Sequence, residues 1–320
     1  MWNFGLRKIE LNARDNIYFS RYDFKALLPG HGVKLGIPNH TLGGVLSDVY
    51  TAWERCFRKI SRRPRLKGRR NKLNSIPFPD SLRAPKGNRI SVPGIGKARF
   101  HKQDIPEGKI KCGRIVKRAS GWYLCLFIDA QPKAIPQVAH GHIGIDPGFK
   151  SLLTLSTGEK IEHPRELEAS AQRLAQAQRG GRKKLATRLQ ERIGNQRKDR
   201  NHKLSRRLVS ENAVIRFSGD NHKGIATKFG KSVASSSHGQ LRQQLAYKCT
   251  QSGRRYDEPD SSFSTKTCST CKARTGPSGW AGLKIRQWTC TECGSSHDRD
   301  INAATNTLHA GGGWPLERCA

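Results

Sequence analysis

The sequence predicts a mixed α/β protein built from several domains, and three observations lead to that class. Its 320 residues leave room for two or three domains at roughly 100–200 residues each. The spacing of apolar residues changes along the chain, because residues 1–60 follow the period of helices and residues 88–130 follow the period of strands. Two pairs of closely spaced cysteines near the C-terminus indicate a further, smaller domain.

The N-terminal part of the chain is predicted to be helical. In the segment that starts near Leu42, the apolar residues Val45, Val49, Trp53 and Phe57 recur every four residues. This spacing puts all four on one face of a helix, where they are expected to pack into a core.

A strongly basic segment follows this helix. Seven of the twelve residues from Ser61 to Lys72 are Lys or Arg, with Pro64 and Gly68 among them. Such a run is ordinarily a solvated surface, but in a chain this basic we favour a loop that contacts phosphates. The candidate side chains for that contact are Arg62, Arg63, Arg65, Lys67, Arg69 and Arg70.

The next part of the chain is predicted to consist of strands. Short alternating runs at 89–92, 97–100, 111–118 and 121–129 are separated by turns rich in Pro and Gly. The last two runs read as a hairpin. A small β-barrel or meander over residues 73–135 is the expected arrangement, followed by a proline-containing linker.

A second group of strands and helices begins near residue 142. An apolar strand ends on Asp146, and a second strand runs from Leu152 to Leu155. Further short strands are predicted at 214–217 and 254–258, with a helix from His238 to Gln251 between them.

Between these strands, residues 165–209 are predicted to form two antiparallel helices that are broken at Gly180–Gly181. Basic residues outnumber acidic ones here so heavily that pairing along the helices cannot neutralise them. The candidate nucleic-acid contacts in this segment are Arg182, Lys183, Lys184, Arg197, Lys198 and Lys203.

The overall charge points to a polyanionic partner. The chain has 59 Lys and Arg against 25 Asp and Glu, a formal net charge of +34. Basic residues that neutralise phosphates release counterions, so nucleic acid is the obvious partner. A ribosomal-type binder or a basic disordered tail remains an alternative, although six Trp and eleven Phe argue against general disorder. The absence of a run of about 18 apolar residues excludes a membrane protein, and the N-terminus does not read as a signal peptide. We therefore expect a cytoplasmic protein.

The strongest local motif is a pair of CxxC knuckles. Cys268 and Cys271 are separated by 18 residues from Cys290 and Cys293, a spacing typical of zinc ribbons. Disulfides are the alternative, but they do not suit a chain without an export signal. Four thiolates complete the shell of Zn²⁺, so the predicted site is structural. The other cysteines, which lack ligand spacing, are Cys56, Cys112, Cys125, Cys249 and Cys319.

Three aspartates, Asp146, Asp298 and Asp300, form a second pattern. Asp298 or Asp300 could simply cap the helix that begins near Ile301. If the fold brings them near Asp146, such carboxylates can instead hold two Mg²⁺ ions about 3.5–4 Å apart and clamp a phosphodiester.

The motifs as a whole resemble the TnpB family of transposon-encoded RNA-guided nucleases. The resemblance is carried by Gly144-Ile-Asp-Pro-Gly, Ser264-Thr-Lys-Thr-Cys-Ser-Thr-Cys, Arg286-Gln-Trp-Thr-Cys-Thr-Glu-Cys-Gly and His297-Asp-Arg-Asp-Ile-Asn-Ala-Ala-Thr-Asn. It extends over residues 135–308. It implies an RNase H-like (RuvC) nuclease domain with an inserted zinc ribbon, preceded by a helical recognition lobe and a wedge-type β-barrel. It also implies a guide RNA from the transposon end and a DNA target.

With the resemblance, the expected domains are a helical lobe at 1–72, a wedge barrel at 73–135, a nuclease domain at 136–264, a zinc ribbon at 265–296 and a last helix and tail at 297–320. The first strand of the wedge barrel is expected to be missing, because Met1 begins at the segment that normally follows it. An unpaired sheet edge would result.

The resemblance also implies a catalytic triad of Asp, Glu and Asp. The two aspartates correspond to Asp146 and Asp300, but Ser218 stands where the family has its Glu. A serine cannot supply the missing charge. Either the carboxylate is replaced by Glu258, at the end of the next strand, or the chain binds its target without cutting it. We favour Glu258; Asp220 and Glu211 are weaker candidates.

The predicted function is therefore RNA-guided, Mg²⁺-dependent cleavage of DNA. The alternatives are a nuclease-inactive, RNA-guided repressor and a zinc-ribbon RNA-binding protein without catalysis.

Overall fold

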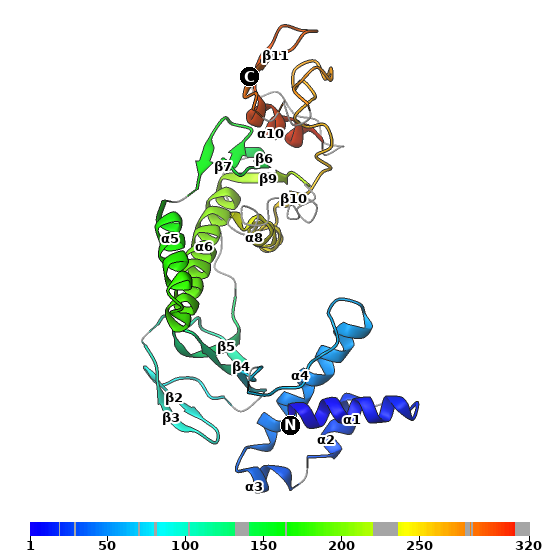
Figure 1. Ribbon diagram of the computed structural model, residues 1–320, viewed down its shortest axis with the longest axis vertical. Coiled ribbons are helices and arrows are strands. Elements are labelled where there is room, and N and C mark those ends of the chain that lie inside the picture. Colours follow the sequence, from blue (N-terminus) through cyan, green and yellow to red (C-terminus); the bar gives the residue numbers. More distant parts are fainter. Residues whose placement is uncertain are drawn as a thin grey trace. The chain divides into compact units, whose positions relative to one another are not determined.

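The computed structural model describes residues 1–310 except 19, 29, 70, 80–81, 102, 132–140, 164, 220–235, 279–281 and 283 (Figure 1). The chain divides into two compact units, Met1–Gln131 and Pro132–Ala320. Within the described ranges, every helix is too short or too polar to cross a bilayer.

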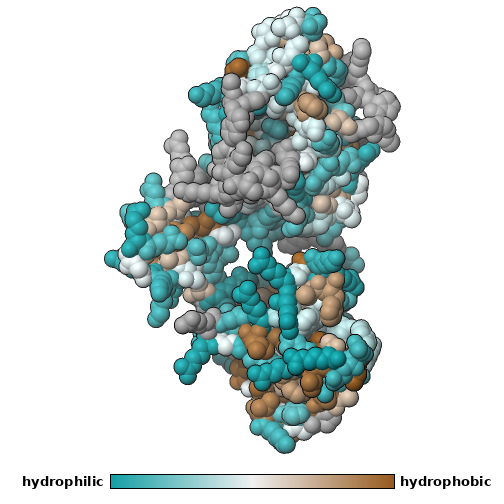
Figure 2. Space-filling view, turned by 45° about the vertical axis from the view of Figure 1, so that its right-hand side comes forward, coloured by the Kyte–Doolittle hydropathy of each residue, from teal (hydrophilic) through white to brown (hydrophobic). Residues whose placement is uncertain are grey.

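Four helices open the first unit. They are α1 (Trp2–Arg14), α2 (Arg21–Ala26), α3 (His31–Leu35) and α4 (Asn39–Phe57). Leu6 of α1 packs with Leu46 and Val49 of α4 in a common core. Hydrophobic residues also lie on the surface of this unit (Figure 2). Large side chains that are more than three-quarters exposed are Tyr18, Tyr22 and Val33, at 79%, 77% and 89%.

The predicted apolar face of α4 is confirmed at three of its four positions. Val45, Val49 and Trp53 are buried, whereas Phe57 is 69% exposed. The expectation for Phe57 is wrong because α4 ends at this residue. Its ring stacks on that of Trp53, with 5.5 Å between the centroids.

The strands of the first unit form two ladders instead of one closed barrel. β1 (Ser75–Phe78), β4 (Lys109–Arg118) and β5 (Gly121–Asp129) make an antiparallel sheet in the order β1-β4-β5. β2 (Arg89–Val92) and β3 (Gly96–Arg99) make a separate hairpin. Both ladders contribute to one core that includes Phe78, Ile90 and Leu124.

The helices and strands of this unit pack together. Arg114 of β4 forms a two-pronged ion pair with Asp48 of α4. A Cβ on Gly44 of α4 would lie only 2.8 Å from Pro77 of β1. The predicted boundary at residue 72 therefore falls inside one compact unit, and the wedge barrel as a separate domain stays a prediction.

The second unit is built on a five-stranded sheet. Its strands are β6 (Gly141–Pro147), β7 (Ser151–Leu155), β8 (Lys160–Glu162), β9 (Asn212–Phe217) and β10 (Arg255–Asp257), in the order β10-β9-β6-β7-β8. β6, β9 and β10 are parallel, and β7 and β8 are antiparallel to their neighbours. The strands predicted at 214–217 and 254–258 are confirmed as β9 and β10, which pair with each other.

Helices cover both faces of this sheet (Figure 1). They are α6 (Lys183–Glu211) and α8 (His238–Gln251) on one face and α10 (Arg299–Ala310) on the other, while α5 (Arg165–Arg179) packs on α6. On one face, Ile145 and Phe217 share a core with Leu208 of α6 and Leu241 of α8. On the other face α10 lies directly on β6, because Gly144 has no side chain: a Cβ there would lie 2.1 Å from the Ala304 carbonyl oxygen.

The predicted helical hairpin is confirmed. α5 and α6 pack side by side and are joined through Gly180 and Gly181 (Figure 1). Gly181 has φ +64°, a left-handed conformation that favours glycine at the end of a helix. The backbone N–H of Arg182 donates to the Ala177 carbonyl, at 2.9 Å, and closes the turn.

Candidate functional site

The four predicted zinc ligands lie together. The Sγ atoms of Cys268 and Cys293 are 3.7 Å apart, and those of Cys271 and Cys290 are 3.6 Å apart; all four lie within 4.8 Å of one another. A tetrahedral Zn²⁺ with Zn–S bonds of about 2.3 Å requires sulfurs roughly 3.8 Å apart. The four cysteines therefore fit a closed, structural zinc site.

Local structure brings the knuckles together. β11 (Gln287–Thr289) and β12 (Ser296–Asp298) form a short hairpin around the second knuckle. The backbone N–H of Cys268 donates to the Ala273 carbonyl, at 2.8 Å, and that of Gly294 donates to the Cys290 carbonyl, at 2.9 Å. Each knuckle is thus a tight turn that points two sulfurs to one side.

The polar side chains around the sulfurs were not predicted from the sequence. The Thr275 hydroxyl donates to Cys290 Sγ over 3.2 Å and lowers the pKa of that thiol to about 6, which favours the thiolate that binds metal. His297 Nε2 lies 3.1 Å from Cys268 Sγ. Ser295 lowers the pKa of Cys293 through a side-chain hydrogen bond. These residues have no ligand spacing, so only the fold reveals them.

The remaining cysteines show no metal cluster among the described residues. Cys249 is buried in the sheet core, while Cys56, Cys112 and Cys125 are partly buried. Cys319 lies outside the described residues.

Asp146 and Ser218 lie side by side at the ends of β6 and β9. The backbone N–H of Ser218 donates to the Ile145 carbonyl, 2.9 Å away, and so extends the parallel pairing beyond Phe217. Ile145 and Phe217 point into the core beneath α6 and α8. Because side chains alternate along a strand, Asp146 and Ser218 point to the opposite face, the one that α10 covers.

Ser218 is fully buried, at 0% exposure. Its hydroxyl has no hydrogen-bond partner in the described part of the chain. Its carbonyl accepts a hydrogen bond from Arg242 of α8. The position at which the resemblance expects a carboxylate thus holds a small, neutral side chain.

Glu258 lies on the other face of the sheet. Tyr256 is in register with Ile215, which is in the core beneath α8, and Glu258 follows two residues later on the same face. The contacts agree: the Tyr256 hydroxyl donates to Glu258 Oε1 over 2.7 Å, and Arg242 Nη1 lies 3.5 Å from Oε2. Burial, together with this hydrogen bond, raises the pKa of Tyr256.

Asp300 lies in the first turn of α10, where both carboxylate oxygens are 3.0 Å from Arg286 Nη1. The helix is capped by Asp298, whose Oδ1 accepts from the backbone N–H groups of Asp300 and Ile301 at 3.0 and 3.1 Å. Asp298 also pairs with Lys160 Nζ at 2.7 Å. Of the two aspartates considered as caps, Asp298 is therefore the cap.

The three predicted catalytic carboxylates do not lie close enough together to bind a metal ion jointly. Within the described ranges, the only His, Cys, Asp or Glu side chains that bring three or more ligand atoms together are the four cysteines. Glu258 is bound to Tyr256 and Arg242 on the face opposite Asp146. These residues do not fit a two-Mg²⁺ centre. Of the weaker candidates, Glu211 ends α6, and Asp220 lies outside the described residues.

Hydrogen bonds and an ion pair hold the basic segment after α4 against α1. Trp2 Nε1 donates to the Arg65 carbonyl at 3.1 Å, and Asn3 exchanges two hydrogen bonds with the backbone of Lys67, at 2.9 and 2.7 Å. Arg63 is paired with Glu10 at 2.8 Å. Arg62, Arg65 and Arg69 are exposed, and Arg70 lies outside the described residues.

The predicted contacts on α6 divide into two groups. Arg182, Lys183, Lys184 and Lys198 are exposed. Lys203 is exposed but paired with Asp199 at 2.8 Å. Arg197 is partly buried, and burial lowers its pKa. The exposed, unneutralised charge therefore lies mainly at the start of α6.

Comparisons with known proteins agree with these motifs. Residues 128–218 match the family described as "Probable transposase", and residues 238–307 match "Cas12f1-like, TNB domain". The chain is 33% identical, over 286 residues, to a Streptomyces pristinaespiralis protein named "Putative RNA-guided DNA endonuclease"; the match covers 83% of this chain and 70% of that protein. It is 24% identical, over 304 residues, to the Escherichia coli (strain K12) protein "Putative RNA-guided DNA endonuclease InsQ", covering 86% and 75%.

Among solved structures, a Cas12f1-sgRNA-target DNA complex aligns with 96% of this chain and 90% of that one, at 17% identity and a TM-score of 0.44. Identity to the Streptomyces protein over most of both chains, two matching family descriptions and the shared motifs lead to one conclusion: the chain belongs to the TnpB family.

Proposed function

We propose that this chain binds a guide RNA from its transposon end and uses it to recognise DNA. The names of the relatives from Streptomyces and Escherichia support this proposal. The formal net charge of +34 supports it as well, because a guide and its paired target form a polyanion. Base pairing then supplies most of the specificity, while the protein holds the strands. Such a protein is expected in the bacterial cytoplasm, on the nucleoid.

The second unit is proposed to be an RNase H-like domain with an inserted zinc ribbon. The strand order of its sheet supports this assignment. The first strand, β6, lies between β7 and β9; it is antiparallel to β7 and parallel to β9. The four cysteines support a structural Zn²⁺, whose role is to hold the segment between β10 and α10.

We propose further that the chain binds target DNA without cutting it. The observation that carries this proposal is the buried Ser218 beside Asp146, in the place of the expected carboxylate. The nearest replacement suggested by the sequence, Glu258, is held by Tyr256 and Arg242 on the other face of the sheet. Asp146 and Asp300 alone supply too few carboxylates for the two-metal arrangement.

A second candidate function is DNA cleavage by Asp146, Asp300 and Glu258. It is favoured by the names of the relatives and by the packing of α10, which carries Asp300, on β6, which carries Asp146. It requires the Glu258 side chain to leave Tyr256 and Arg242 and to reach the opposite face.

The test uses the full chain purified with RNA transcribed from its transposon end. Binding to a DNA that pairs with the guide is measured by filter retention, and cutting of the same DNA is measured in Mg²⁺. Sequence-dependent binding without cutting is expected. Ser218→Glu is expected to create cleavage, whereas the matched Ser218→Gln, which adds the same bulk without charge, is not.

Cutting by the unaltered chain would overturn the proposal that it only binds. In that case, loss of cleavage in Glu258→Ala would assign the second candidate, and survival of cleavage in Glu258→Ala would exclude Glu258. If the chain purifies with bulk RNA and binds no guided target, it is a zinc-ribbon RNA-binding protein without guided activity.

A further inference from the structure

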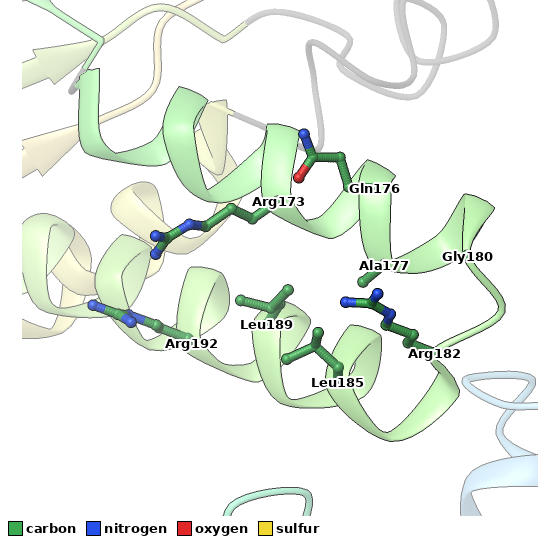
Figure 3. Close-up of a pocket in the computed structure, with 8 residues that line it drawn as sticks. All are labelled: Arg173, Gln176, Ala177, Gly180, Arg182, Leu185, Leu189 and Arg192. Carbon is green, nitrogen blue, oxygen red and sulfur yellow. The ribbon is translucent and has the colours of Figure 1, made fainter.

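A groove lies along the hairpin formed by α5 and α6 (Figure 3). Its volume is about 550 Å³, and it is lined by Arg173 and Ala177 from α5, by Leu185, Leu189 and Arg192 from α6, and by Arg182 from the turn between them. The groove belongs to the second unit and is separate from the strand ends and from the zinc ligands.

The rim of this groove is positively charged. Arg173 and Arg192 extend from the two helices toward each other at one end, and Arg182 lies beside Ala177 at the other end (Figure 3). Among the described residues, none of the three guanidinium groups has an ion pair or a side-chain hydrogen bond. Like charges that face each other without a carboxylate between them favour an anion in the groove.

The floor of the groove is apolar. Leu185 is 41% exposed, although it is a large aliphatic side chain in a polar helix, and Leu189 lies one turn further along the same wall (Figure 3). An inorganic anion makes no use of such a floor. A nucleotide does, because its phosphate suits the arginines and its flat base covers aliphatic carbon.

The turn holds the groove open in advance of binding. Gly181 adopts φ +64°, and the Arg182 backbone N–H donates to the Ala177 carbonyl at 2.9 Å. Arg182 is therefore fixed at the end of α5 before α6 begins. A preformed site loses less conformational entropy when its ligand binds.

We propose that this groove binds an unpaired nucleotide of the guide RNA, with its phosphate held by Arg173 and Arg192 and its base against Leu185 and Leu189. The inference rests on the proposed function, since it takes the guide RNA as the bound strand. A duplex does not fit the description, because paired bases are stacked inside it. Unpaired loop bases, which also stack on arginine planes, are the usual targets of RNA recognition.

The test uses the full chain and a 20-nucleotide oligouridine RNA that carries one 4-thiouridine for photo-crosslinking. Arg173→Gln/Arg192→Gln is compared with Arg188→Gln, a control on the same helix that is exposed and does not line the groove. The double variant is expected to bind about tenfold more weakly, and its salt slope is expected to fall by about 0.7, the value for one phosphate contact on a single strand. Crosslinks to the 183–192 segment are expected in the control and lost in the double variant.

The base contact is tested with Leu185→Ser. Unaltered protein is expected to prefer the oligouridine over the same strand with abasic nucleotides by about fivefold, which corresponds to the lower end of the energy of a base–aromatic stack, about 1 kcal/mol. Leu185→Ser is expected to lose that preference without a change in salt slope. An unchanged preference would remove the base from the proposal.

The outcomes separate this inference from the proposed function. If the unaltered chain binds the RNA but the double variant behaves like Arg188→Gln, the groove assignment is overturned and the function stands. If the double variant loses as much affinity for blunt duplex DNA as for single-stranded RNA, the groove is a general cationic surface. That result also overturns the inference. A chain that binds no RNA at all overturns the proposed function itself.

Discussion

The Tyr256 hydroxyl donates a hydrogen bond to the Glu258 carboxylate across 2.7 Å, and this contact holds Glu258 on the face of the sheet that α8 covers. Arg242 of α8 completes the cluster, with its guanidinium 5.1 Å from the Phe217 ring centroid. Glu258, the residue that directly follows β10, is therefore bound on the face of the sheet opposite Asp146.

Removal of this hydroxyl is expected to destabilise the second unit. Tyr256→Phe loses one hydrogen bond to a charged group, about 1 kcal/mol once the partial exposure of Glu258 is taken into account. Urea unfolding measures the change, and Tyr247→Phe is the control, because Tyr247 lies on α8 and is 41% exposed. Equal unfolding midpoints for the two variants would contradict a structural role for the Tyr256–Glu258 contact.

The zinc site is expected to hold one ion per chain. Cys293→Ser removes one of four ligands, and a closed shell does not tolerate that loss, so metal analysis of the purified protein should find little zinc. Cys125→Ser, which changes a cysteine outside the cluster, should keep the full amount. Loss of zinc in both variants, or in neither, would contradict the assignment.

The interaction of Asp298 with Lys160 makes stability depend on pH. Burial acts to raise the pKa of Asp298, but the hydrogen bonds from Lys160 and from the start of α10 outweigh it and lower the pKa below its ordinary value of 3.8. A lowered pKa adds stability above the unfolded value, and this stability is lost as the pH falls through the folded value.

Asp298→Asn is therefore expected to be less stable than the unaltered chain at pH 7, by about 0.5–1 kcal/mol. The difference is expected to shrink as the pH falls below about 3.8 and to disappear once the pH is below the lowered pKa of the folded state. Thermal unfolding across this range measures it. Asp199→Asn, which removes an exposed pair with Lys203, should change stability little at any pH. A pH-independent difference for Asp298→Asn would show that the cap and not the charge is responsible.

Two glycines are expected to respond in opposite ways to alanine. Gly144 lies beneath α10, and its new Cβ would meet the Ala304 carbonyl oxygen at 2.1 Å, so Gly144→Ala should destabilise the fold by about 3 kcal/mol or more. Gly194 lies within α6 with open space around it, so Gly194→Ala should stabilise it by about 1 kcal/mol. An unchanged or raised midpoint for Gly144→Ala would contradict the packing of α10 on β6, and a lowered midpoint for Gly194→Ala would contradict the open space around Gly194.

Much of the local structure could be predicted from periodicity. The helix from His238 to Gln251 is α8 with the same bounds, and the break at Gly180–Gly181 is the turn between α5 and α6. These elements depend on neighbours in the chain. The exposed ring of Phe57 was not predictable, because burial at a helix end depends on whether another element reaches that far.

The sequence by itself determined the spacing of the four cysteines, the family motifs and the replacement of a carboxylate by Ser218. Only the tertiary structure decided where Glu258 points. The pairing of Tyr256 with Ile215 sets the face on which Glu258 lies, and a shift of one residue would reverse it. The register of β10 on β9 is set by packing between segments some 40 residues apart in the chain. For that reason, no local pattern of residues in the sequence predicts this register.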